Sequence, residues 1–217
     1  NQAGSTASQA SSETKTTTDS VGRYMGNCVI GLDPGFTGGG AAVVLDMDGN
    51  LLAYRIWNPT SAATSIITVA NVCKWLWKSY PQAKLVTEGV YIQYYVKRVD
   101  SIKAAKQLEK DGHIKVPGSF SNAPMKLSKC IGIFLCMFPE NHIELPTSEW
   151  RRIVGMKKQK SRESWKQAGI NLAVKLLPKG SKLGSVVAQG NDHAAEAYLI
   201  ALAGLSAMGT IEDLLAS

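Results

Sequence analysis

Four acidic side chains differ from the other acids of the chain because each falls at an end of a predicted element. Two end apolar strands, and two lie one helical turn apart where the last helix begins: Asp33, Glu88, Asp192 and Glu196. Carboxylate oxygens are hard ligands that suit Mg²⁺ or Mn²⁺. Two such ions can activate a water molecule and stabilise the leaving oxygen of a phosphodiester. If the four side chains meet, the chemistry they favour is two-metal-ion hydrolysis.

The last helix can present several polar groups to one point. Residues three or four apart project from the same face of a helix, so both Asp192 and His193 can converge with Glu196. The apolar sequence AYLIALAGL follows Glu196. A helix this apolar is mostly buried, and a carboxylate inside it needs a partner. A bound cation would be such a partner.

The glycines after Asp33 would allow a phosphate backbone to approach closely. The stretch LDPGFTGGG places almost no side chain behind this carboxylate, and glycine permits close contact with another backbone. Each acid taken alone also has a structural explanation. Asp33 can begin a turn, Glu88 can end a surface strand, and Asp192 can be a helix N-cap. The sequence alone leaves these alternatives open.

Apolar periodicity and turn residues define the elements that must position these acids. Asp48-Gly49-Asn50 joins two strands as a hairpin. Three meandering strands followed by alternating helices and strands predict an α/β protein with a mixed five-stranded sheet flanked by helices. This arrangement resembles the ribonuclease H-like fold, in which the first and fourth strands are neighbours. The expected strands are 28–33, 40–46, 51–57, 84–87 and 142–145, and the expected helices are 61–79, 101–110, 124–138, 162–177 and 192–207.

Composition bounds the class of protein. The chain has 217 residues and a net charge of +7, which favours a polyanionic partner. Residues 1–22 are rich in Ser and Thr and are expected to be a disordered leader or linker, whereas 23–217 are expected to form one domain. Residues 179–191 are expected to be a flexible segment.

The apolar segments predict a core and no membrane partner. The longest apolar run, Cys130–Phe138, is far below the length of a membrane span. All four cysteines lie in apolar contexts and show no zinc-site spacing, which predicts reduced core residues and a reducing compartment. They are Cys28, Cys73, Cys130 and Cys136. Trp150 and Trp165 are also expected in the core.

Three motifs carry a family resemblance. In order and spacing, VIGLDPGFTGGGAAVV, KLVTEGV and NDHAAEAYLIALAG resemble the motifs of RuvC-type Holliday-junction resolvases, and most of all the chloroplast branch of plants and algae. The resemblance implies a homodimeric endonuclease that uses two Mg²⁺ or Mn²⁺ ions and nicks four-way DNA junctions symmetrically, without a nucleotide cofactor. Together with the Ser/Thr-rich leader it implies a chloroplast location at the nucleoid.

The same resemblance assigns roles to individual residues. It implies that the metal ligands are Asp33, Glu88, Asp192 and Glu196, with His193 near the metal or the attacking water. Bacterial members commonly space their last two acidic positions by three, whereas here Asp192 and Glu196 are four apart. Whether Asp192 or His193 is the third ligand therefore stays open.

Basic and aromatic residues suggest how DNA would bind. The segment 151–162 is rich in Lys and Arg and holds no acid, which is typical of phosphate contacts. Tyrosines after Glu88 could stack on bases opened at a crossover. Family members place a lysine near the scissile phosphate, for which Lys157, Lys158 and Lys160 are candidates, with Lys158 assigned to catalysis. The predicted DNA-binding residues are Tyr91, Tyr94, Lys97, Arg98, Lys126, Arg151, Lys157, Lys158, Lys160 and Arg162.

Other functions are compatible with parts of the pattern. A ribonuclease H or another metal-dependent nuclease would use the same carboxylates. A DNA-architectural protein could keep the fold without catalysis. A sugar-kinase or actin-like ATPase would need a second phosphate loop, which the sequence does not show. The helix expected at 124–138 can contribute to a dimer interface or to the core.

Overall fold

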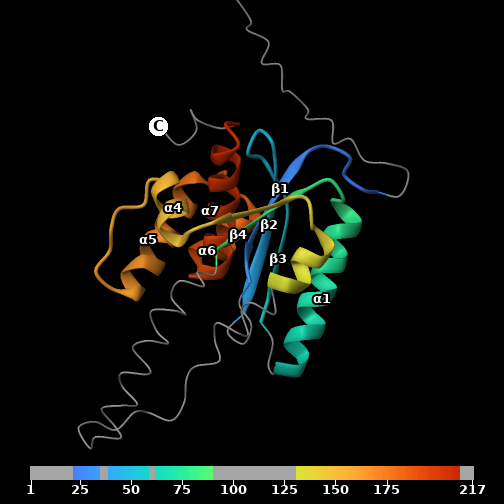
Figure 1. Cartoon of the computed structure of the whole chain (residues 1–217). Helices are drawn as coiled ribbons and strands as arrows, with labels where there is room; N and C mark the ends of the chain where they lie inside the picture. The colour runs from blue at the N-terminus through green and yellow to red at the C-terminus, as the bar shows by residue number, and fades with distance from the viewer. Residues whose placement is uncertain (1–21, 35–38, 59–61, 90–130, 211–217) are drawn as a thin grey trace, which may run out of the picture.

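The computed structural model describes residues 22–34, 39–58, 62–89 and 131–210. Five strands in these residues form one sheet with the order β3-β2-β1-β4-β5 (Figure 1). β2 pairs antiparallel with β1 and β3, β4 pairs parallel with β1, and β5 pairs parallel with β4. This order and these directions are those of the ribonuclease H-like fold, so the predicted fold class is confirmed. The strands are β1 (Cys28–Asp33), β2 (Gly40–Asp46), β3 (Leu51–Trp57), β4 (Lys84–Glu88) and β5 (His142–Leu145).

Helices cover both faces of the sheet. One face carries α1 and the helical residues 131–137, and the other carries α4, α5, α6 and α7 (Figure 1). No helix in the described ranges is both long enough and apolar enough to cross a membrane. The helices are α1 (Ala62–Ser79), α4 (Thr147–Ile153), α5 (Arg162–Leu176), α6 (Lys182–Ala188) and α7 (Asp192–Ala207).

The alternation of side chains along β1 decides which face receives the acid at its end. Ile30 and Leu32 are fully buried against α1, and Val29 is fully buried on the side of α7. Successive residues of a strand point to opposite faces. Asp33 therefore shares the α7 face with Val29 and Gly31, although its strand is apolar throughout.

Two glycines allow α7 to lie directly on the sheet. A Cβ atom on Gly31 would stand 2.1 Å from the carbonyl oxygen of Ala197, and one on Gly204 would stand 2.5 Å from Cγ2 of Val86. Real Cβ atoms do not approach other atoms this closely, so both positions require glycine. The close contact at Gly31 determines where α7 lies along β1, and so also where the first turn of the helix lies.

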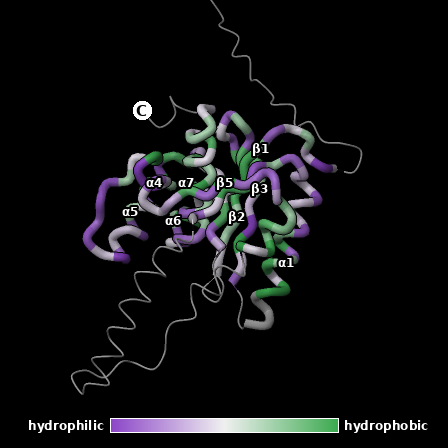
Figure 2. The backbone as a smooth tube through the Cα atoms, in the orientation of Figure 1, coloured by the Kyte–Doolittle hydropathy of each residue, from purple (hydrophilic) through white to green (hydrophobic). Residues whose placement is uncertain are grey.

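The structure differs from the sequence-based expectation in two short helices. α4 occupies residues for which no element was predicted, and α6 occupies most of the segment 179–191, so the expectation of flexibility there was wrong. α6 begins because the Ser181 side chain accepts a hydrogen bond from the Gly184 amide, an N-cap contact. Figure 2 shows that the connection between α4 and α5 is hydrophilic, as its lysines suggested. The helix expected at 101–110 and the start of the one expected at 124 lie outside the described residues.

Most of the expected core residues in the described ranges are buried, but Trp165 is only half-buried. Cys28, Cys73 and Trp150 are buried, and the two cysteines are free thiols. Cys136 is an exposed free thiol, so its assignment to the core was wrong. Its helix turns Phe134 inward instead. Cys130 lies outside the described ranges.

Candidate active site

The ends of β1 and β4 bring two carboxylates together. The parallel register pairs Leu32 with Thr87, and the next residue on each strand is an acid, Asp33 on β1 and Glu88 on β4. Glu88 follows Val86 by two positions, and Val86 packs on the α7 side, so both acids face α7. Neighbouring parallel strands thus place two negative charges at one edge of the sheet.

The start of α7 closes over this edge. The helix begins because the Asn191 side chain accepts a hydrogen bond of 2.8 Å from the Ala194 amide. His193 in the first turn places Nδ1 at 2.6 Å from Oδ2 of Asp33. Gly39, whose φ is +93°, lies beneath the imidazole, and a Cβ atom there would be 3.4 Å from its Cδ2. Glycine is required here by the positive φ and by the carbonyl oxygen of Trp57, which a Cβ atom would approach to 2.9 Å.

Glu196 completes the acidic cluster one turn later. Burial, which has the largest effect, and the charges of Asp33 and Glu88 together raise the pKa of Glu196 to about 7, against a partial offset by Arg151. Asp192 adds a smaller effect in the same direction. Charges act at this strength only over short distances in a partly buried site. Asp33, Glu88 and Glu196, from β1, β4 and α7, therefore lie close enough to affect one another, whereas the sequence predicted a cluster of four acids that includes Asp192.

Each carboxylate of this cluster has a polar partner from another element. Thr147 of α4 donates its hydroxyl to Oε1 of Glu88. Arg151, also of α4, places Nη2 at 3.8 Å from Oε1 of Glu196. These contacts and the one between His193 and Asp33 connect α4, α7 and the sheet at the site.

Asp192 is engaged differently from the other three acids. Its carboxylate forms an ion pair with Lys166 of α5. Burial raises the pKa of Asp192, but the hydrogen bond and charge of Lys166, together with the charge of His193, outweigh burial and lower the pKa overall. The ammonium group of Lys166 therefore balances the negative charge of Asp192 within the protein.

The fit of a divalent cation can be judged from this donor set. No group of three His, Cys, Asp or Glu side chains in the described ranges stands in a geometry ready to coordinate a metal. After the larger effect of burial, the charges of Asp33 and Glu88 nevertheless raise the pKa of Glu196 more than Arg151 lowers it. Hard oxygen donors with surplus negative charge suit Mg²⁺ or Mn²⁺. The chemistry of the cluster fits the metal, although its side chains are turned toward protein partners.

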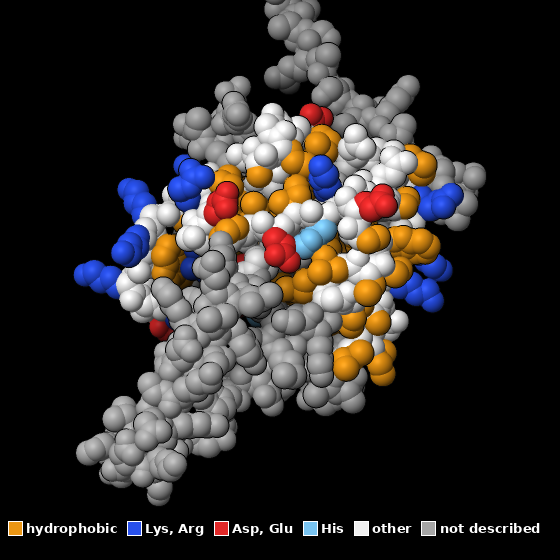
Figure 3. All heavy atoms as spheres, viewed as in Figure 1, with side chains coloured by type: hydrophobic (Ala, Val, Ile, Leu, Met, Phe, Trp, Pro, Cys, Tyr) orange, Lys and Arg blue, Asp and Glu red, His pale blue; other side chains and the backbone are white. Residues whose placement is uncertain are grey.

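The predicted DNA-binding residues fall into three groups. Arg151 lies in the cluster itself, beside Glu196. Four others are exposed between α4 and α5 or at the start of α5: Lys157, Lys158, Lys160 and Arg162. Figure 3 shows Lys and Arg side chains gathered at the edge of this face near α5, and acidic side chains beside a histidine near its centre. Tyr91, Tyr94, Lys97, Arg98 and Lys126 lie outside the described residues.

Sequence reasoning missed two residues of the site. Thr147 and Lys166 contact Glu88 and Asp192, respectively. Neither stands in a motif, and neither is near its partner in the sequence. Only the crossing of α4 and α5 with the sheet and α7 brings these pairs together.

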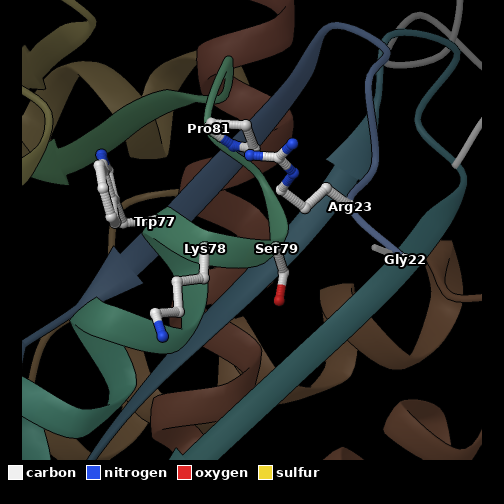
Figure 4. A pocket seen from close by; sticks show the side chains of 6 residues that line it. All are labelled: Gly22, Arg23, Trp77, Lys78, Ser79 and Pro81. Atoms are coloured by element: carbon white, nitrogen blue, oxygen red, sulfur yellow. The ribbon is translucent and has the colours of Figure 1, made fainter. Parts of the chain in front are cut away.

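A separate pocket lies elsewhere on the molecule. It is formed where α1 ends and the chain approaches the start of β1 (Figure 4). The acidic cluster lies at the opposite, carboxyl end of β1. None of the described residues that line it is an acid; they are Gly22, Arg23, Trp77, Lys78, Ser79 and Pro81. This pocket is therefore not part of the candidate active site.

Comparison with known proteins finds similarity among solved structures. No family model matches the chain, and no curated protein matches it in sequence. A solved structure of RuvC from Thermus thermophilus is similar to this chain with a TM-score of 0.48 and 16% sequence identity, over 84% of this chain and 97% of that chain. The assignment of the fold to the ribonuclease H-like class rests on the strand order and directions given above.

Proposed function

We propose that this protein is a metal-dependent endonuclease that nicks four-way DNA junctions. The observation that carries the proposal is the meeting of Asp33, Glu88 and Glu196, which lie on three elements and together raise the pKa of Glu196 to about 7 through burial and mutual repulsion. Such a cluster costs stability unless a cation joins it. The motifs around these acids resemble those of RuvC-type resolvases, which supports a junction as the substrate.

The residues of the chain have separate tasks in this proposal. Asp33, Glu88 and Glu196 would hold the divalent ions, and Asp192 is a fourth candidate. When bound, Mg²⁺ or Mn²⁺ would activate water and stabilise the leaving oxygen of the phosphodiester. His193 donates from Nδ1 to Asp33 and so fixes the orientation of that carboxylate.

The exposed basic residues would bind the DNA backbone. Lys157, Lys158 and Lys160 lie on the hydrophilic connection that follows α4. Since α4 itself reaches the acidic cluster through Arg151, a strand held on this connection would pass close to the carboxylates. Lys158 is the proposed contact to the scissile phosphate. The proposal includes a homodimer, because symmetric nicking of two opposing strands needs two active sites.

The test is cleavage of labelled DNA of defined shape. A four-way junction, a linear duplex of the same sequence and an RNA–DNA hybrid are incubated with the protein in Mg²⁺, Mn²⁺ or EDTA. We expect paired nicks in the junction, only with metal. Asp33→Asn should abolish nicking and keep junction binding, whereas Asp48→Asn, an exposed acid in the β2–β3 hairpin, should behave as the unmodified protein.

The other outcomes identify the rival functions. Cleavage of the hybrid without the junction would identify a ribonuclease H. Junction binding that is unaffected by metal, with no nicking, would identify a DNA-architectural protein. Binding should also weaken steeply with salt if phosphate contacts dominate.

The chloroplast branch and a nucleoid location are the finer part of the proposal. They rest on the Asp-His pair and the Ala-Glu-Ala helix of the last motif, NDHAAEA. A fluorescent fusion of the full-length protein in algal or plant cells tests the location. Signal outside the plastids would remove this part and leave the nuclease proposal in place.

A further inference from the structure

The connection from β5 to α4 passes directly beside Glu88. The parallel register pairs Glu88 with Leu145 at the end of β5. Pro146 follows as the N-cap of α4, and Thr147 is the first residue of the helix. Thr147, two residues after Leu145, therefore lies at the same edge of the sheet as Glu88. There the Thr147 hydroxyl donates a hydrogen bond to Oε1 of Glu88.

The helix that carries Thr147 is held firmly in place. Trp150 is fully buried in the core between α4 and α7. The guanidinium carbon of Arg151 lies 5.1 Å from the centre of the Trp150 ring and 4.4 Å from that of Trp165 on α5. Cation–π contacts of this kind contribute about 0.5–2 kcal/mol each. A hydroxyl presented from such a helix has little freedom to leave its partner.

Side chains on one face of α4 contact two carboxylates of the cluster. Thr147 and Arg151 are four residues apart and so project from the same side of the helix. Thr147 contacts Glu88 of β4, and Arg151 approaches Glu196 of α7. The helix thus connects the two glutamates without itself contributing an acid to the cluster.

We propose that Thr147 is a positioning residue for Glu88. Its hydroxyl fixes one carboxylate oxygen, which sets the orientation in which Glu88 meets a divalent cation. Carboxylates that bind metals are commonly held by such outer hydrogen bonds, and removal of one typically weakens metal affinity 10–100-fold. This inference rests on the proposed function, because it assumes that Glu88 is a metal ligand.

The test is a set of substitutions that change the hydroxyl with little change of shape. Thr147→Val removes the hydroxyl and keeps the volume, and Thr147→Ser keeps the hydroxyl. Ser148→Ala, at an exposed position on the same helix, is the matched control. The affinity for Mn²⁺ is measured by electron paramagnetic resonance, and circular dichroism checks the fold. If valine disturbs the helix, Thr147→Ala provides a second variant without a hydroxyl.

The expected result is specific to the hydroxyl. Thr147→Val should weaken Mn²⁺ binding at least about 10-fold, while Thr147→Ser and Ser148→Ala stay close to the unmodified protein. Affinity for a four-way junction in EDTA should not change, because Thr147 acts through the metal ligand. Unchanged Mn²⁺ affinity in a folded Thr147→Val protein would overturn the inference.

Failure of the proposed function gives a different result. If the unmodified protein binds Mn²⁺ but cuts no DNA, the nuclease proposal fails and Thr147 is still judged by its effect on Mn²⁺ affinity. If the unmodified protein binds no Mn²⁺, both proposals are overturned. Normal binding and nicking by the unmodified protein and by Thr147→Val removes only the role of Thr147.

Discussion

Nδ1 of His193 lies 2.6 Å from Oδ2 of Asp33, although the two residues are 160 positions apart in the sequence. The contact joins the first turn of α7 to the end of β1. The side chains are 29% and 18% exposed, so the pair lies at the surface of the cluster, within reach of a substrate. We interpret His193 as the residue that orients Asp33, while Glu196 provides the additional carboxylate from α7.

The contact predicts a difference between two substitutions of His193. Asparagine places an N–H donor near the position of Nδ1, whereas glutamine places one near the position of Nε2. His193→Asn should therefore keep much of the nicking rate, and His193→Gln should lose roughly 10–100-fold, as expected for a lost outer hydrogen bond. Single-turnover nicking of a labelled junction measures this. If both variants lost the same nicking activity, the contact between His193 and Asp33 would not explain the role of His193.

Glu196 should make the metal-free protein less stable as pH rises. Its pKa is raised from the ordinary value of 4.5 to about 7, first by burial and then by Asp33 and Glu88. The folded state therefore holds this proton more tightly than the unfolded state. Its contribution to stability is complete below pH 4.5 and is lost as pH rises through about 7. At 1.36 kcal/mol per pKa unit, the loss is about 3 kcal/mol.

Urea unfolding in EDTA between pH 4 and 8 measures this contribution. We expect Glu196→Gln to gain stability relative to the unmodified protein as pH rises, and Glu140→Gln, at an exposed position, to show no such trend. Added Mg²⁺ at pH 8 should raise the melting temperature of the unmodified protein more than that of Glu196→Gln. A pH-independent difference between the two proteins would contradict the clustering of charge around Glu196.

The ion pair between Lys166 and Asp192 predicts a modest role for Asp192 in catalysis. If Asp192 stays paired with Lys166 in the active protein, Asp192→Asn should reduce nicking far less than Asp33→Asn does. The Lys166 side chain is 41% exposed, so the pair should stabilise the fold by no more than about 1 kcal/mol. Lys166→Met and Asp192→Asn should therefore cause small losses that do not add in the double variant. Complete loss of nicking in Asp192→Asn would instead identify Asp192 as a metal ligand.

Gly31 should be essential for the position of α7. A Cβ atom there would meet the carbonyl oxygen of Ala197 at 2.1 Å and the amide nitrogen of Ala201 at 2.4 Å. Both are backbone atoms, so the whole helix would have to move, and we expect Gly31→Ala to cost about 3 kcal/mol of unfolding free energy. Gly132 is the matched control, because a Cβ atom there meets nothing within 4 Å.

The two glycine variants are compared by urea unfolding and by nicking. Gly132→Ala should be neutral or stabilise its helix by up to about 1 kcal/mol. Gly31→Ala should also lose nicking, because displacement of α7 would separate His193 from Asp33. A Gly31→Ala protein with normal stability and activity would show that α7 can shift without disturbing the site.

The sequence by itself determined the sheet and the acids at its edge. Four of the five strands have the bounds that periodicity predicted, and the last helix does too. A strand alternates with a period of two, so Asp33 had to share a face with Val29 and Gly31 once the core was known. A continuous apolar run gave less information. In CIGIFLCMF the sequence could not show that Phe134 faces the core and Cys136 faces solvent.

Only the tertiary structure decided the partners of those acids. Thr147, Arg151 and Lys166 lie on α4 and α5, and their contacts depend on how these helices cross the sheet and α7. A helix of two turns such as α4 shows too little periodicity to be recognised in the sequence. Residue types could indicate that carboxylates would lie close together, because the carboxyl ends of neighbouring parallel strands lie at the same edge of a sheet. They could not indicate which hydroxyl or cation would face each one, because side chains distant in sequence are paired only by packing.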